Sequence, residues 1–90
     1  MYANENLPKV RTPVTVPTLQ AMKDLGERIA TLTAYDASFA RAMDAAGIDA
    51  VLVGDSLGMV IQGAGNTVSV SVDDMIYHSR CVANGLQSAL

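Results

Sequence analysis

The sequence predicts an α/β fold with parallel strands, and three features of the chain indicate it. Two short apolar runs, 28–34 and 48–53, have the β-branched composition of buried strands. The segment between them repeats its apolar residues at helical spacing. A strand, a helix and a second strand in so short a stretch close as a right-handed parallel crossover. Half of the 90 residues are hydrophobic and 17% are charged, so the chain has the composition of a folded domain and not of a disordered tail.

The N-terminal residues 1–16 are expected to form an irregular arm, because prolines and asparagines interrupt any periodicity there. A short helix is predicted over 18–25. Pro17 precedes it, its apolar residues share one face, and Gly26 suits the position after the last turn. These signals divide the chain into an arm, 1–16, and one domain portion, 17–90.

The central helix is bounded by residues that are typical of helix ends. Asp36 or Ser38 follows the first strand, and either side chain can accept hydrogen bonds from the free N–H groups of the first turn. Gly47 suits the left-handed conformation after the last turn. The predicted apolar stripe of this helix consists of Phe39, Ala42, Met43 and Ala46.

An insertion with several glycines, 57–70, follows the second strand, and its alternating residues 67–70 favour a small strand or hairpin arm. Ser71, with Asp74 three residues later, is typical of a helix start. That helix is expected to bury residues such as Val72, Met75, Ile76 and Val82 and to end at Asn84-Gly85. Residues 89–90 are then expected to open a third strand.

Parallel sheets are normally covered by helices and extended by further strands. Two parallel strands alone leave both outer edges unpaired, which invites aggregation. We therefore expect the 90 residues to be the N-terminal part of a larger α/β domain. The alternative is that they form the whole molecule, as a non-catalytic remnant or an interaction module.

Charge and composition exclude several classes of function. Six Lys and Arg against nine Asp and Glu give a net charge of −3, which offers no basic surface to nucleic acid. No apolar run approaches the roughly 18 residues that span a bilayer, and the N-terminus lacks the apolar core of a secretory signal. The single cysteine, Cys81, fits a reducing compartment. We expect a cytoplasmic protein with neither nucleic-acid nor membrane partners.

Functional residues of parallel α/β folds lie in the loops that follow the carboxyl ends of the strands. Asp36 and Asp55 occupy such positions and are expected to face the same end of the sheet. Helix capping accounts for Asp36. For Asp55, between Gly54 and Ser56, the alternative to a functional role is a simple turn residue.

Residues 54–58 also fit the G-x-S-x-G nucleophile elbow and spell the Gly-Asp-Ser-Leu block of a family of esterases. An elbow requires a helix directly after the serine, and residues 59–63 do not favour a helix start. It also requires a histidine oriented by a carboxylate. His78, the single histidine, lies inside a predicted helix. A serine esterase whose histidine lies beyond Leu90 is the alternative enzyme.

Three blocks, in order and with matching spacing, closely resemble the ketopantoate hydroxymethyltransferase family. They are Thr-Ala-Tyr-Asp-Ala-Ser-Phe-Ala at 33–40, Val-Gly-Asp-Ser-Leu-Gly-Met-Val at 53–60 with Gln62-Gly63, and Val-Asp-Asp-Met at 72–75 with Tyr77-His78. The likeness runs from about Thr15 to Leu90. It implies a (βα)8 TIM barrel, a fold of roughly 250 residues. The chain covers its N-terminal third: a first helix, strand, helix, strand, a small β insertion, a helix and the start of a third strand.

The resemblance also implies the reaction. A hydroxymethyl group passes from methylenetetrahydrofolate to 3-methyl-2-oxobutanoate (α-ketoisovalerate) through a Mg²⁺-stabilised enolate, and the product is ketopantoate, in the first step of pantothenate and coenzyme A synthesis. The family implies a homo-oligomer, commonly a decamer.

By the same resemblance, Asp55 matches a family aspartate that binds the metal and the keto acid, and Ser56 a neighbour that binds the keto acid. The general base and the other metal ligands are expected beyond Leu90, so no catalytic residue is expected within this segment. The residue types suit these roles, because Mg²⁺ prefers oxygen ligands with one or two carboxylates and a hard dication stabilises charge that develops on a ketone oxygen.

Overall fold

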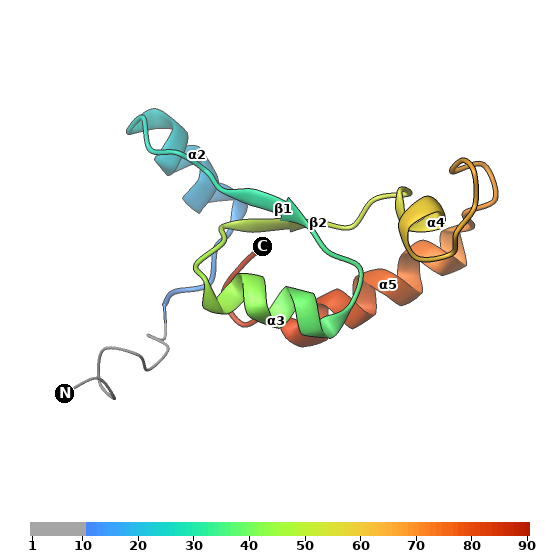
Figure 1. The fold of residues 1–90 in the computed structure, drawn as a ribbon. Helices are drawn as coiled ribbons and strands as arrows, with labels where there is room; N and C mark the ends of the chain where they lie inside the picture. Colours follow the sequence, from blue (N-terminus) through green and yellow to red (C-terminus); the bar gives the residue numbers. More distant parts are fainter. Residues whose placement is uncertain (1–10) are drawn as a thin grey trace.

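The computed structural model describes residues 11–90, which fold as an α/β unit (Figure 1). Within that range it contains four helices and one parallel sheet of two strands. In chain order the elements are α2 Val16–Asp24, β1 Thr31–Thr33, α3 Ala37–Ala45, β2 Ala50–Leu52, α4 Leu57–Val60 and α5 Val72–Gly85.

The predicted parallel strand, helix and strand are confirmed. β1 and β2 pair in parallel with Leu32 opposite Val51, and α3 connects them. α3 and α5 pack against each other on one side of the sheet, as Figure 1 shows. The carboxyl ends of both strands therefore lie at the same edge of the sheet, as the site prediction required.

The strands are shorter than predicted, and the expectation that they are buried is wrong for the described residues. Leu32 is 51% and Leu52 is 58% exposed. Side chains alternate between the two faces of a strand, and helices cover one face only. Leu52 lies opposite Thr33 on the face away from the core, whereas Leu32 shares the face of Val51 but lies on the outer strand.

The core lies between the sheet, α3 and α5. Ala34, Ala40 and Val82 are almost fully buried there, and Met43, Val51, Val53 and Leu86 pack around them. The predicted stripe of α3 is only partly right, since Phe39 is 64% exposed while Ala40, outside that stripe, is fully buried. The small side chain of Ala40 lies against α5, where a large one would not fit.

Gly85 explains how closely the two helices approach. A Cβ atom at this position would lie 2.4 Å from the backbone oxygen of Ala37 and 3.0 Å from the Cβ of Ala40. Glycine thus permits α5 to end directly against the first turns of α3. The sequence indicated Gly85 only as a helix end, a role that the end of α5 at this residue confirms.

Residues 87–90 return along the start of the sheet. Leu90 donates to the carbonyl of Asp49 and accepts from the amide of Val51, at 3.0 and 2.7 Å, which is the pairing of a parallel bridge on the free edge of β2. Residues 89–90 are not assigned to a strand. Their hydrogen bonds nevertheless follow the course expected for a third one.

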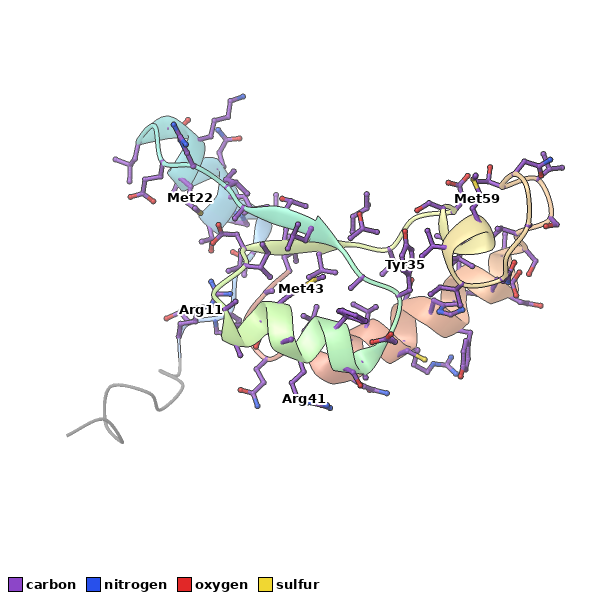
Figure 2. All side chains as sticks on the ribbon, in the orientation of Figure 1. Arg11, Met22, Tyr35, Arg41, Met43 and Met59 are labelled. Carbon is purple, nitrogen blue, oxygen red and sulfur yellow. The ribbon has the colours of Figure 1, made fainter. Side chains whose placement is uncertain are left out.

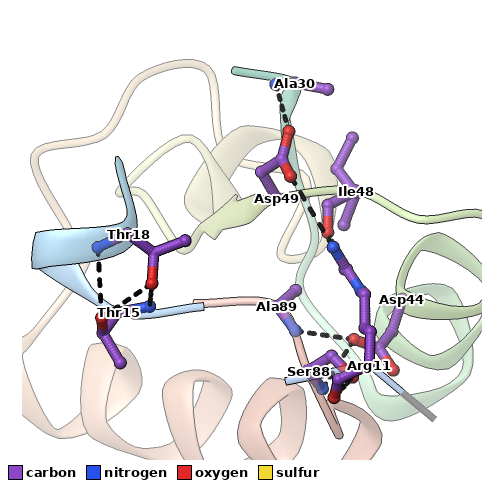
Figure 3. Close-up of polar contacts among 9 residues, drawn as sticks. All are labelled: Arg11, Thr15, Thr18, Ala30, Asp44, Ile48, Asp49, Ser88 and Ala89. Atoms are coloured by element: carbon purple, nitrogen blue, oxygen red, sulfur yellow. Dashed lines mark hydrogen bonds and ion pairs between the residues drawn. The ribbon is translucent and has the colours of Figure 1, made fainter. Parts of the chain in front are cut away.

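Asp44, on α3, holds this returning segment (Figure 3). Its carboxylate accepts from the backbone amides of Gln87, Ser88 and Ala89, at 3.2, 3.0 and 2.8 Å. Burial raises the pKa of Asp44, but these three bonds and the charge of Arg11 outweigh burial and lower it below the ordinary value.

The expected helix at 18–25 begins two residues earlier, at Val16. Thr15 and Thr18 form a capping box, and Pro17 fits within the first turn, where its missing N–H costs nothing. Of the predicted arm, residues 1–10 lie outside the described range. The remainder is tied down, because Val14 donates to the carbonyl of Ser88 and Arg11 pairs with Asp49 at 3.6 Å.

The predicted strand or hairpin at 67–70 is wrong, since the structure has turns there. The amide of Val68 donates to the side chain of Asn66, and that of Val70 to the carbonyl of Thr67. These local bonds compete with a sheet ladder. The capping box of Ser71 and Asp74 at the start of α5 is confirmed.

Candidate functional site

The candidate site lies at the carboxyl ends of the two strands. Tyr35 and Asp36 follow β1, and Gly54, Asp55 and Ser56 follow β2. Asp55 is exposed, whereas Ser56 and Tyr35 are half-buried. The topology therefore brings both sequence-predicted residues, Asp55 and Ser56, to the edge where α/β enzymes hold their ligands.

A short helix fixes the turn that carries these residues. α4 begins directly after Ser56, which corrects the expectation that no helix would start there because residues 59–63 do not favour one. The amides of Leu57 and Gly58 donate to the carbonyls of Gly54 and Asp55, at 3.2 and 3.0 Å. The backbone carbonyls of the turn are thus engaged with α4, while the side chain of Asp55 remains at the surface.

Tertiary packing explains why α4 forms where the sequence did not favour a helix. Leu57 is fully buried. A Cβ at Gly58 would lie 2.4 Å from the Cγ2 atom of Val70, so glycine permits the insertion to fold closely over the helix. The packing of Leu57 and Gly58 therefore holds the turn in place, although the local sequence does not favour a helix.

Ser56 makes its hydrogen bond with a residue that the sequence did not single out. Its Oγ lies 2.5 Å from the hydroxyl of Tyr35. The carbonyl of Tyr35 in turn accepts from Nδ1 of His78, on α5, at 2.7 Å. Figure 2 shows Tyr35 between the sheet and α4. Its place at the end of a parallel strand was the signal that could have marked it.

The two acidic residues of the site have different surroundings. The carboxylate of Asp36 accepts from the amide of Phe39 at 2.8 Å, so the prediction that it caps α3 is confirmed. Asp55 offers an exposed carboxylate. Within residues 11–90 no group of three or more His, Cys, Asp or Glu side chains is placed to hold a metal ion.

A single exposed carboxylate nevertheless fits the way proteins hold Mg²⁺. The ion keeps several waters and takes one or two protein carboxylates together with oxygen atoms of the substrate. Asp55 provides a hard oxygen donor at the open edge of the sheet. Asp55 therefore fits the ion as one ligand among several.

The geometry does not support the serine-esterase alternative. Ser56 has ordinary helical angles, with φ −57° and ψ −14°, whereas a nucleophile elbow is strained. His78 bonds to the backbone of Tyr35, and the partner of Ser56 is a phenol and not an imidazole. The base that would activate a nucleophilic serine does not reach it in this part of the chain.

Residues 11–90 contain no helix with the length and apolar character needed to cross a membrane.

Comparison with known proteins assigns the chain to a family. The sequence pattern of the family described as ketopantoate hydroxymethyltransferase matches residues 13–90. Proteins named 3-methyl-2-oxobutanoate hydroxymethyltransferase are similar to the chain throughout this region. The protein from Leptothrix cholodnii is 58% identical over 77 residues, which are 86% of this chain and 27% of that protein.

Two further relatives carry the same name. The protein from Methylobacillus flagellatus is 65% identical over 72 residues, or 80% of this chain and 28% of that protein. The protein from Alkalilimnicola ehrlichii is 57% identical over all 90 residues and 32% of its own length. The chain thus spans about a third or less of the curated relatives it matches. With a family match over residues 13–90 and identities of this size, the chain belongs to the ketopantoate hydroxymethyltransferase family.

Proposed function

We propose that this chain forms the beginning of an enzyme that makes ketopantoate, by transfer of a hydroxymethyl group from methylenetetrahydrofolate to 3-methyl-2-oxobutanoate. The observation that carries the proposal is the family match across residues 13–90, which includes the turn after β2 with its exposed Asp55. In this proposal, residues 17–90 are the N-terminal portion of one (βα)8 barrel, preceded by the arm 1–16.

Asp55 is proposed to hold Mg²⁺ and, through it, the keto acid. Its carboxylate is exposed at the edge of the sheet, and its own turn is fixed by α4. A bound Mg²⁺ supplies a Lewis acid for the oxygen atoms of the keto acid, which lowers the cost of the negative charge that develops when the adjacent carbon loses a proton. Gly54 leaves room for a ligand beside the backbone, because it has no side chain.

Ser56 is proposed to bind the keto acid directly. A serine hydroxyl can donate one hydrogen bond and accept others at the same time. In the proposed role it donates to the carboxylate of the substrate while its oxygen contacts Tyr35. A hydrogen bond to a charged group is worth about 1.5–3 kcal/mol, which is enough to orient a small keto acid.

Other parts of the reaction are assigned to residues beyond Leu90. We propose that these include the general base and further metal ligands, since among residues 11–90 no cluster of potential ligands surrounds Asp55. The proposed assembly is a homo-oligomer, as the sequence resemblance implies, and its proposed location is the cytoplasm, as the composition and the single cysteine led us to expect. No residue of the present chain is assigned the proton transfer.

A hybrid enzyme tests the proposed function. Residues 1–90 would replace the matched segment of the Alkalilimnicola ehrlichii relative, which is 57% identical over all 90 residues. Purified hybrid and parent would be given 3-methyl-2-oxobutanoate, methylenetetrahydrofolate and Mg²⁺, and ketopantoate would be quantified by mass spectrometry. We expect the hybrid to form ketopantoate at a rate comparable with the parent. A hybrid that folds and assembles like the parent but forms no ketopantoate would contradict the proposal.

A further inference from the structure

We propose that Tyr35 is a positioning residue for Ser56. Its phenol donates a hydrogen bond to the Oγ of Ser56 and so leaves the serine proton free to bind the carboxylate of the keto acid. The inference rests on the substrate-binding role proposed above for Ser56.

The distance and surroundings of the two hydroxyl groups support this role. The oxygen atoms lie 2.5 Å apart, at the short end of O–H···O hydrogen bonds. Both residues are half-buried, so water competes less for the pair than at an exposed site. The two side chains come from the ends of adjacent strands, which brings them together without a long, flexible connection.

Three hydrogen bonds hold the backbone at Tyr35 and at its two neighbours. The amide of Ala34, before it, donates to the carbonyl of Leu52 at 3.2 Å and ties the backbone to β2. Asp36, after it, caps α3. The carbonyl of Tyr35 accepts from His78 at 2.7 Å. A hydroxyl on so fixed a backbone is preorganised to select one position of its partner.

The chemistry of the two hydroxyl groups sets the direction of the bond. A phenol is more acidic than an aliphatic alcohol and is the better donor. When Tyr35 donates, the oxygen of Ser56 accepts and its single proton remains available. Without this bond the serine hydroxyl is free to sample three staggered positions, and the substrate has to select one on binding.

Replacement of Tyr35 by Phe in the hybrid enzyme removes the hydroxyl and keeps the ring. We expect Tyr35→Phe to raise the KM for 3-methyl-2-oxobutanoate roughly two- to tenfold, as for loss of one hydrogen bond, with kcat little changed. Tyr77→Phe is the matched control, because Tyr77 is 62% exposed on α5 and should retain the parental KM. An unchanged KM in Tyr35→Phe would overturn the proposal.

A double-mutant cycle separates positioning from an independent role. If Tyr35 acts through Ser56, then Ser56→Ala and Ser56→Ala/Tyr35→Phe have the same KM. If the two substitutions instead raise the KM by factors that multiply in the double mutant, Tyr35 acts on the substrate or the fold without Ser56. That result would overturn the proposal.

A second experiment needs no turnover and therefore distinguishes this inference from the proposed function. In the hybrid enzyme, with Cys81 replaced by Ser, the substitution Ser56→Cys places a thiol beside Tyr35. A donating phenol stabilises the thiolate, so alkylation by iodoacetamide should begin at a lower pH than in Ser56→Cys/Tyr35→Phe. Circular dichroism would verify that both variants are folded. Identical pH profiles would show that Tyr35 does not donate at this position.

Discussion

Asp55 and Ser56 are adjacent in the sequence, but the structure gives them different surroundings. Asp55 is exposed, whereas Ser56 is half-buried and bonded to Tyr35. The sequence rule for strand ends identified Asp55, and the family resemblance added Ser56. It did not identify Tyr35, because a hydrogen bond between residues 21 positions apart depends on how the strands pair.

Removal of the Ser56 hydroxyl should weaken binding without abolishing chemistry. In the hybrid enzyme we expect Ser56→Ala to raise the KM for the keto acid about tenfold or more, as for a lost hydrogen bond to a charged group, with measurable activity remaining. Steady-state kinetics with varied keto acid measure this change. Complete loss of activity, together with an acyl group trapped on Ser56 in the parent, would instead favour the esterase.

Asp44 predicts how acid affects the segment 87–89. Because its pKa is lowered in the folded state, its contribution to stability is present above the unfolded pKa of about 3.9 and is lost as the pH falls through the lower folded value. Asp44→Asn should therefore lower the melting temperature of the hybrid at pH 7 and lessen its further fall below pH 4. Glu27→Gln, at an exposed position outside the helices, is the control. If the melting temperatures of the Asp44→Asn hybrid and of the unsubstituted hybrid fall in parallel as the pH is lowered, this role is contradicted.

At the level of helices and strands, local sequence signals were sufficient to predict the helix caps. Asp36 and Ser71 were expected as helix caps and are caps, because capping depends on residues three positions apart. Burial was predicted less well. Large apolar residues suggested that Phe39 faces the core, but the approach of α5 selects the small Ala40.

Two parts of the insertion differ from their predictions. α4 forms with its first residue, Leu57, buried. Residues 67–70 form turns where their alternating apolar and polar side chains favoured a strand. The helix could not be predicted from local preference, because the packing of Gly58 against Val70 joins residues 12 positions apart. The turns at 67–70 depend instead on local hydrogen bonds to Asn66 and Thr67, which the alternating pattern did not indicate. The place of Asp55 after β2 was predictable, but the packing that holds its turn was not.

The contact between α3 and α5 predicts the effect of a methyl group at Gly85. Gly85→Ala would bring its Cβ to 2.4 Å from a backbone oxygen, so one helix must move. Overpacking costs about 1–3 kcal/mol. The better helix propensity of alanine offsets at most about 1 kcal/mol of this cost. We expect a lower melting temperature for the hybrid, measured by circular dichroism. Gly65→Ala, with open space around the new Cβ, should be neutral. Equal effects of the two substitutions would contradict the packing argument.

The described residues form a two-stranded parallel sheet whose strands are only partly covered. Leu90 makes two hydrogen bonds with one edge of β2, while exposed Leu32 and Leu52 lie on opposite faces of the sheet. Apolar strands with little cover are prone to pair with other chains.

We therefore expect an isolated polypeptide of residues 1–90 to associate and to lack a cooperative thermal transition. Sedimentation and circular dichroism measure the two properties. A monomer with a sharp two-state transition would show that the 90 residues fold independently, contrary to this account.

The Mg²⁺ dependence of ketopantoate formation by the hybrid enzyme carrying Asp55→Asn tests whether this carboxylate holds the metal ion. We expect Asp55→Asn to abolish Mg²⁺-dependent formation of ketopantoate and Asp73→Asn to leave it intact. A folded Asp55→Asn enzyme with near-parental turnover and the same Mg²⁺ requirement would contradict this expectation.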